Sequence, residues 1–273
     1  MPMSPRLLRP RASGGFDPRS ISGLQAWWTP FDLATLSQTS DGTTAITGNS
    51  QPVAYIRDRV NGYVLTQTTN NNRPNYLSAG INGYPALDFD GVNDALFTSS
   101  GGATGIARNV GGVTIFAVSN LDANGSGTFL PLVFFSTGVS AASTRSSLAV
   151  GDLGRFWAAG RRVDGGSVSG AIGSTTAALG TSYVCCAALN YSGQVARIFV
   201  NGSVDATNSI FHDGGNTADT DSLSVCLFGV NNGAQNLLDG RLGDALVYNR
   251  LLSDTEISTV SRWLGSRYGV TVA

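Results

Sequence analysis

The sequence predicts an all-β protein, a two-sheet antiparallel sandwich of the jelly-roll type that ends in a short helix. Three observations lead to this fold class: many short apolar runs, turn residues between them at intervals of about 8–12 residues, and one helical pattern near the C-terminus. The chain has 273 residues, and its 35 glycines are about twice the ordinary share. A jelly roll accommodates roughly 250 residues in one domain.

The expected strands follow one another from residue 24 onward. The run at 113–119 is largely apolar, as in a central strand covered on both faces. The run at 195–200 leads through Asn201-Gly202 into 203–207, and Asn-Gly favours a two-residue hairpin because both residues accept positive φ. A second hairpin is expected around Gly151-Asp152. The other strands are expected at 24–28, 84–90, 95–98, 130–136, 146–150, 154–158, 182–189, 222–229 and 240–249, with a turn at 91–94.

The one helix is expected after Ser253. Glu256 follows this N-cap by three residues and completes a capping box, which gives the only Glu of the chain a structural role. Leu252 and Ile257 are placed for a hydrophobic staple, and Gly269 can end the helix in left-handed geometry. We expect the helix to close one edge or end of the sandwich.

The charge composition excludes several functions. Charged residues make up 13%, about half the usual share, and the net charge of −1 argues against broad nucleic-acid binding. All 17 basic residues are Arg, so Schiff-base and P-loop lysine chemistry are excluded, and the single His212 excludes zinc sites built from several histidines. The sequence contains no run of about 18 apolar residues, so it predicts no membrane-spanning helix.

The cysteines predict reduced, buried thiols. Cys185 and Cys186 are adjacent, so in a strand they point to opposite faces. The three cysteines show no metal-binding spacing, and their number is odd. A disulfide bridge from Cys226 to Cys185 or Cys186 stays open as an alternative. Because the N-terminus has no apolar signal segment, we expect folding in a reducing cytoplasm.

Residues 1–20 are expected to form an extended basic arm ahead of a sandwich domain at 21–273. The segment carries four arginines against Asp17, and four prolines favour extended backbone. One interpretation is a loose tail. The other is an arm that docks on an acidic partner surface, and the contact residues would be Arg6, Arg9, Arg11, Phe16 and Arg19.

Four segments of the sequence, 21–28, 83–96, 197–202 and 240–268, follow one another in a characteristic order. This order resembles the concanavalin A-like lectin/glucanase superfamily, in its laminin-G-like branch. The resemblance implies a jelly roll, and the departure at 28–32 from an Asp-rich stretch puts a ligand role at that corner in doubt. Residues 8–16 look like the start of tailed-bacteriophage proteins, which implies a virion location, assembly in the host cytoplasm, capsid or tail partners and a homo-oligomer.

The sequence predicts that the chain is not an enzyme. Glucanases of this superfamily use two Glu, whereas Glu256 is alone and caps a helix. Asp88 and Asp90 share a strand face, but Asp90 begins a turn that favours Asp for local hydrogen bonding. His212 lies in a turn-rich stretch, and no Gly-x-Ser-x-Gly elbow accompanies it.

Rim loops could bind a glycan or Ca²⁺, the only cofactor that the sequence suggests. Calcium takes six to eight oxygen ligands, and turn carboxylates and amides supply some of them. Turn formation and, for Trp157, core packing are the structural alternatives. The rim candidates are Asp90, Asn93, Asp94, Trp157, Arg161 and Asp213.

Two functions therefore remain. The first is a non-enzymatic virion structural protein, in head decoration, a head fibre or tail attachment, that docks through its arm. The alternative is a carbohydrate-binding adhesin that recognises host surface glycans.

Overall fold

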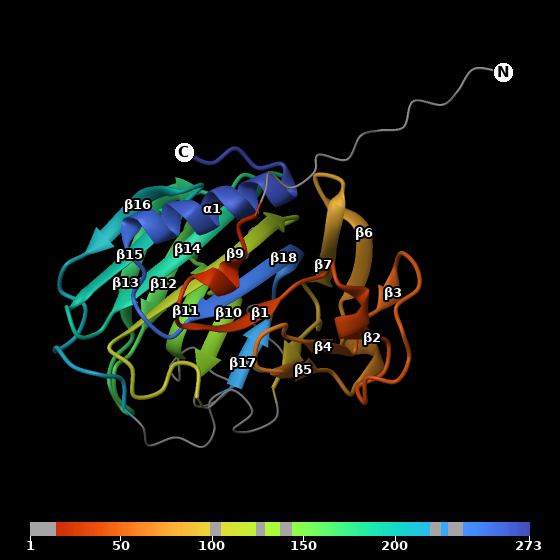
Figure 1. Ribbon diagram of the computed structural model, residues 1–273, viewed down its shortest axis with the longest axis horizontal. Coiled ribbons are helices and arrows are strands. Elements are labelled where there is room, and N and C mark those ends of the chain that lie inside the picture. Colours follow the sequence, from red (N-terminus) through yellow and green to blue (C-terminus); the bar gives the residue numbers. More distant parts are fainter. Residues whose placement is uncertain (1–14, 99–104, 124–128, 137–143, 219–224, 229–236) are drawn as a thin grey trace.

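Two antiparallel sheets packed face to face form the body of the protein (Figure 1). The computed structural model describes residues 15–98, 105–123, 129–136, 144–218, 225–228 and 237–273. The first sheet has the strand order β16 (Ser203–Asn208), β15 (Val195–Val200), β14 (Ser182–Asn190), β9 (Gly112–Leu121), β18 (Asp239–Tyr248), β7 (Tyr84–Asp90), β6 (Asn75–Ile81) and β3 (Gln51–Pro52), with β1 (Leu24–Trp28) also paired to β18.

The second sheet lies behind the first in Figure 1. Its strand order is β13 (Ser169–Thr176), β12 (Arg155–Gly160), β11 (Thr144–Val150), β10 (Leu130–Ser136), β17 (Val225–Phe228), β8 (Leu96–Phe97), β5 (Val64–Thr66), β4 (Tyr55–Arg57) and β2 (Leu36–Ser37). Short 3-10 turns lie at Pro18–Ser20, Leu33–Thr35, Asn70–Asn72 and Asp152–Gly154. The predicted all-β sandwich is confirmed.

The main core lies between the sheets, and a second apolar layer lies outside the first sheet. Strand β9 is buried along its whole length because Ile115 faces the other sheet while Phe116 faces outward. Cys185 and Cys186 divide in the same way between the two layers, and both thiols are free. The predicted burial of these two cysteines on opposite strand faces is confirmed.

Helix α1 (Asp254–Tyr268) covers the outer face of the first sheet, as Figure 1 shows. The expectation that it closes an edge or end of the sandwich is therefore wrong. The outer face carries Phe116, Phe199 and Leu246, and burying these side chains stabilises the fold only if another apolar surface covers them. The helix supplies that surface along Ile257 and Leu264.

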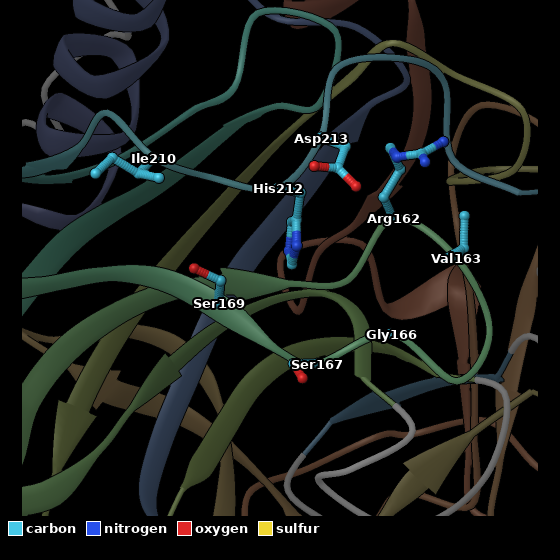
Figure 2. Close-up of a pocket in the computed structure, with 8 residues that line it drawn as sticks. All are labelled: Arg162, Val163, Gly166, Ser167, Ser169, Ile210, His212 and Asp213. Atoms are coloured by element: carbon cyan, nitrogen blue, oxygen red, sulfur yellow. The ribbon is translucent and has the colours of Figure 1, made fainter.

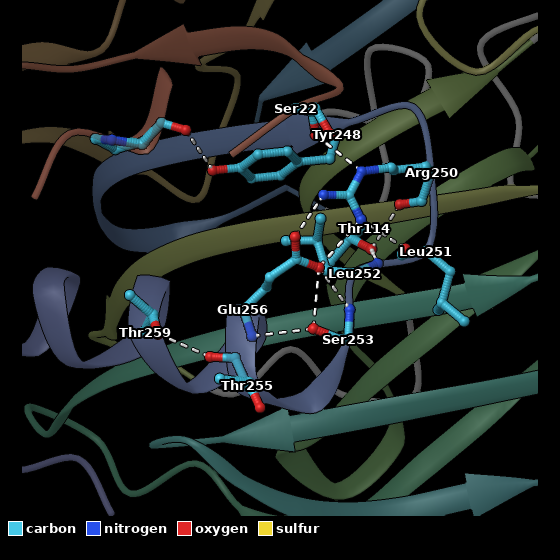
Figure 3. Close-up of polar contacts among 11 residues, drawn as sticks. Ser22, Thr114, Tyr248, Arg250, Leu251, Leu252, Ser253, Thr255, Glu256 and Thr259 are labelled. Carbon is cyan, nitrogen blue, oxygen red and sulfur yellow. Dashed lines mark hydrogen bonds and ion pairs between the residues drawn. The ribbon is translucent and has the colours of Figure 1, made fainter. Parts of the chain in front are cut away.

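The predicted capping box begins this helix (Figure 3). The Ser253 side chain accepts a hydrogen bond from the Glu256 backbone N–H, and the Glu256 carboxylate accepts one from the Ser253 N–H at 2.8 Å. Arg250 adds an ion pair with Glu256 at 2.6 Å, and its hydrogen bond holds the pKa of that carboxyl at about 2. Leu252 and Ile257 are both buried in the same cluster, and Gly269 has a φ of 65°.

The sequence located most of the strands and missed six of them, four of which are only two or three residues long. Strands β10 and β15 begin and end where expected, and Asn201-Gly202 forms the predicted turn between β15 and β16. The β2 to β6 strands and β13 were not expected. The turn at 91–94 exists, but β7 and β8 belong to different sheets, so this turn carries the chain across the sandwich.

The described end of the expected arm belongs to the folded domain. Phe16 packs edge-on against Trp263 in α1, with ring centroids 6.1 Å apart. Pro18 is buried, and its carbonyl accepts a hydrogen bond from the Tyr248 hydroxyl at 3.2 Å. Phe16 and Pro18, which were expected in the arm, therefore pack against the sandwich. No helix among the described residues is long and apolar enough to cross a membrane.

Candidate functional site

The candidate site lies at the edge where β13 of the second sheet and β16 of the first sheet come together. Two side chains of β16 join these strands: the Asp205 carboxylate accepts the Thr175 backbone N–H at 3.0 Å, and the Asn208 side chain donates to the Gly170 carbonyl at 3.0 Å. These bonds use backbone groups that an edge strand otherwise leaves open. The loops that follow β12 and β16 are thereby held close to each other.

A pocket of about 310 Å³ opens between these two loops (Figure 2). The loop before β13 contributes Arg162, Val163, Gly166 and Ser167, β13 itself contributes Ser169, and the loop after β16 contributes Ile210, His212 and Asp213. The lining therefore combines a guanidinium, an imidazole, a carboxylate and hydroxyl groups with the two aliphatic side chains of Val163 and Ile210.

His212 is the most firmly positioned of these residues. Its Nε2 lies 2.7 Å from the Gly160 carbonyl oxygen, and its ring is stacked on Tyr191 with an interplanar angle of 13°. The Tyr191 side chain is fully buried, and its hydroxyl donates to the Arg145 carbonyl at 2.5 Å. Burial raises the pKa of Tyr191 well above its ordinary value, so the phenol ring that stacks on the imidazole stays protonated and neutral.

The other polar side chains of the pocket differ in how many hydrogen bonds they already make within the protein. Arg162 donates through Nη1 to the Asn216 carbonyl at 3.3 Å. The Ser169 hydroxyl oxygen accepts from the Asn208 side chain at 3.2 Å, which leaves its own hydrogen available. Asp213 is exposed, and within the described part of the chain its carboxylate has neither a hydrogen bond nor an ion pair. Ile210 stands 84% exposed at the rim.

Among the predicted rim residues, only Asp213 lines this pocket. Arg161 is 7% exposed and forms an ion pair with Asp164 at 3.3 Å, so its guanidinium is part of a loop network that also contains Arg145. Trp157 is half-buried on the outer face of the second sheet, where it packs edge-on against Phe129 at 5.3 Å. The sequence did not distinguish these faces because it does not give the register between strands.

The predicted cluster at Asp90, Asn93 and Asp94 forms a turn far from the pocket, since β7 is five strands away from β16 in the sheet order. Asp90 Oδ1 accepts the N–H groups of Val92 and Asn93, at 2.8 and 3.1 Å. Asp94 is 3% exposed and accepts the Asp90 N–H, and burial raises its pKa to about 6. The carboxylates of this turn thus serve the local backbone.

No group of three or more His, Cys, Asp or Glu side chains in the described residues is arranged to hold a metal ion. Asp88, the other acid considered for catalysis, forms an ion pair with Arg241 at 3.3 Å. Calcium binding stays a prediction.

The expected partner contacts of the arm are only partly described. Arg6, Arg9 and Arg11 lie outside the described residues. Arg19 forms an ion pair with Asp17 at 2.5 Å, and Phe16 packs on α1, so both of these side chains are engaged within the chain.

Several pocket residues were not expected as site residues from the sequence. His212 was expected to be an ordinary loop residue, and Ser167, Ser169 and Ile210 carried no signal. The glycines that follow His212 were the one local sign, because they indicate a tight turn in which a residue can adopt positive φ. His212 has a φ of 64°. Its bond to Gly160, 52 positions away, had no such sign.

Comparisons with known proteins address the fold. The family model of the concanavalin A-like lectin/glucanases superfamily matches residues 106–258, while no curated protein matches the chain. The binding domain of Paraclostridial Mosquitocidal Protein 1 has a similar structure, with a TM-score of 0.57, 14% identity, and coverage of 78% of this chain and 50% of that one. The chain thus spans half the length of that protein domain.

Two further structures are similar over more of this chain. Domain 4 of the extracellular GH43 arabinanase AbnA from Geobacillus stearothermophilus, solved in complex with arabinotriose, has a TM-score of 0.54 and 12% identity over 87% of this chain and 98% of that one. The sialidase of Trypanosoma rangeli has a TM-score of 0.53 and 15% identity over 92% of this chain and 34% of that one. At such identities these likenesses concern the fold alone. The family match covers more than half of the residues, and the chain belongs to the concanavalin A-like lectin/glucanases superfamily.

Proposed function

We propose that this protein is a non-catalytic carbohydrate-binding module whose site is the pocket between the β12–β13 loop and the loop after β16. The observation that carries the proposal is the lining of that pocket, where a carboxylate without a partner among the described residues, a fixed imidazole and hydroxyl groups lie beside an exposed aliphatic side chain. A sugar offers many hydroxyl groups and an apolar C–H face, and a concave site with a few placed polar groups suits such a ligand.

The structural neighbours support this proposal over attachment to a particle. The arabinanase domain was solved with arabinotriose, and it matches this chain over nearly its whole length. Sugar binding on the same fold is thus a reasonable function to test here.

The proposal includes binding without turnover. Cleavage of a glycosidic bond by the common mechanisms needs two carboxyl groups, about 5 Å apart for retention and roughly 6.5–9.5 Å apart for inversion. Asp213 is the only acid among the described residues that line the pocket. Bound glycans should therefore be released unchanged.

A panel of immobilised glycans, probed with the full chain in the presence of Ca²⁺ or of a chelator, tests this function. We expect selective binding that Asp213→Ala weakens at least about tenfold. Asp41→Ala removes an exposed carboxylate from a distant turn and serves as the matched control. Binding that survives Asp213→Ala would move the site elsewhere, and a panel with no bound glycan would contradict the proposal. The chelator arm shows whether calcium takes part.

The second candidate is a virion structural protein that attaches through its arm. Its support is the charge of residues 1–20, where four arginines accompany one aspartate. Removal of residues 1–14 leaves the packed segment from Phe16 to Ser20 in place. It should abolish attachment to an acidic particle surface and leave glycan binding unchanged. Attachment that persists without residues 1–14 would count against the arm.

A further inference from the structure

We infer that the pocket selects uncharged sugars that present two neighbouring hydroxyl groups, and that His212 Nδ1 and the Asp213 carboxylate accept the hydrogen bonds from those hydroxyls. This inference rests on the proposed function, because it concerns the same pocket. It adds the class of sugar and the atoms that recognise it.

The hydrogen bond to Gly160 fixes the tautomer of His212. A carbonyl oxygen only accepts hydrogen bonds, so the Nε2 atom that lies 2.7 Å from the Gly160 oxygen must carry the hydrogen. In the neutral ring, Nδ1 then holds a lone pair and acts as an acceptor. His212 has no second hydrogen bond within the described residues.

The surroundings of His212 hold the imidazole plane in place. Tyr191 is stacked on one side, and the Phe211 ring centroid is 4.4 Å from that of His212. Gly160 itself leaves no room for a side chain, since an added Cβ would lie 2.1 Å from the Tyr191 hydroxyl. The direction of Nδ1 is therefore set before any ligand arrives, which lowers the entropic cost of binding.

The Asp213 carboxylate provides further acceptors beside the imidazole. Figure 2 shows Asp213 and His212 on the same loop at one side of the pocket, with Ser169 on the strand opposite. A carboxylate and an imidazole lone pair call for donors on the ligand, which a pair of sugar hydroxyl groups supplies. A sugar carboxylate would instead bring a second negative charge and more acceptors, so this wall of the pocket disfavours it.

The remaining lining groups fit the same ligand. The Arg162 guanidinium is bonded to the Asn216 carbonyl and in Figure 2 extends toward that loop, away from the His212 ring. Ile210, at 84% exposure, offers an aliphatic surface to the C–H face of a sugar. The Ser169 hydroxyl can donate to a ring or hydroxyl oxygen, because Asn208 already supplies the bond that its oxygen accepts.

Nuclear magnetic resonance on protein labelled with ¹⁵N in histidine tests the inference directly. His212 is the only histidine, so its two ring nitrogens give unambiguous signals. The probes are methyl glucoside and methyl galactoside, with methyl glucuronide and methyl galacturonide as carboxylated partners that differ at one carbon. We expect a protonated Nε2 in the free protein. We also expect the Nδ1 signal to shift on addition of the uncharged sugars, and affinities at least about tenfold weaker for their carboxylated partners.

Two conservative variants complete the test. Asp213→Asn replaces one carboxylate oxygen by an amide group that donates hydrogen bonds. The variant should bind the uncharged sugars about tenfold more weakly, and its preference for uncharged over carboxylated sugars should be smaller. His212→Asn keeps a residue type that accepts left-handed backbone but removes the imidazole acceptor, and it should weaken binding similarly. Asp41→Asn is the control and should bind as the unaltered protein does.

The outcomes separate this inference from the proposed function. Sugar binding with an unchanged Nδ1 signal, equal affinity for carboxylated sugars, or full affinity in Asp213→Asn would overturn the inference and leave carbohydrate binding standing. Tighter binding of glucosamine than of glucoside would also overturn it, because the pocket would then select a positive charge. Failure of every sugar and every panel glycan to bind would overturn both.

Discussion

At the scale of single residues, Asp94 should make the stability of the protein depend on pH. Burial raises its pKa from an ordinary value of 3.8 to about 6, the hydrogen bond from the Asp90 N–H opposes this, and the charges of Asp90 and Asp88 add to it. Because the folded state favours the protonated acid, the contribution to stability is complete below about pH 4. It is lost as the pH rises through about 6.

Asp94→Asn tests this expectation, because the amide oxygen still accepts the Asp90 N–H while the ionisation is removed. At pH 7.5 the variant should gain up to about 3 kcal/mol in free energy of unfolding, and at about pH 4 it should gain little. Urea unfolding at a series of pH values measures this difference. Asp41→Asn is the control: its carboxyl has a lowered pKa because of hydrogen bonds from Thr39 and Thr43, so removing it cannot produce a gain that grows with pH. A gain at Asp94 that is independent of pH would refute the explanation.

Residue-scale prediction from the sequence succeeded where a role is local. Turn formation was the structural alternative to a rim role for Asp90, because an Asp at a turn accepts nearby N–H groups, and the structure shows those bonds. The burial of Asp94 was not predictable in the same way. It depends on the turn crossing between two sheets, which is a property of the whole topology.

At the scale of elements, the start of helix α1 depends on the only glutamate. The Arg250 hydrogen bond lowers the pKa of Glu256 to about 2, so its stabilising contribution is present above about pH 4.5 and is lost as the pH falls toward 2. Glu256→Ala should cost about 1–2 kcal/mol, because it removes the capping bond to Ser253 as well as the ion pair.

Glu256→Gln should cost less, since the amide oxygen can still accept the Ser253 N–H. Thermal unfolding near neutral pH compares the two variants. Asp254→Asn removes a neighbouring, largely exposed ion pair with Arg197 and should have little effect. Equal losses in the Gln and Ala variants would show that the Arg250 pair, and not the capping bond, holds the helix start.

The two edge strands at the pocket give a second prediction for elements. Asp205→Ala leaves the Thr175 N–H of β13 without its partner, and an edge strand with open backbone groups is a template for pairing with another chain. We expect the variant to self-associate as its concentration rises, measured by size-exclusion chromatography with light scattering. Thr207→Ala, an exposed change on the same strand, should elute as the unaltered protein does. A strictly unchanged elution of Asp205→Ala would mean that β13 is protected by other contacts.

At the scale of the whole molecule, the sequence predicted the architecture but not the assembly of the site. Alternation and turn chemistry are local, so the β15–β16 hairpin and the capping box could be placed from a few residues each. Other features join segments that lie far apart in the chain. They are the contact of β13 with β16, the packing of α1 on a sheet face, and the hydrogen bond between His212 and Gly160. Nothing in the pattern of a single segment encodes such pairings, which is why Asp213 was named as a rim candidate without its neighbours in the pocket.

The central claim is that this sandwich binds a glycan at one edge and leaves it chemically unchanged. Calorimetric titration of the full chain with the strongest glycan from the panel, followed by recovery of that glycan, tests it most directly. We expect saturable binding, an intact glycan after prolonged incubation, and binding at least about tenfold weaker in Asp213→Ala. Recovery of shortened sugars, or undiminished binding by Asp213→Ala, would contradict it.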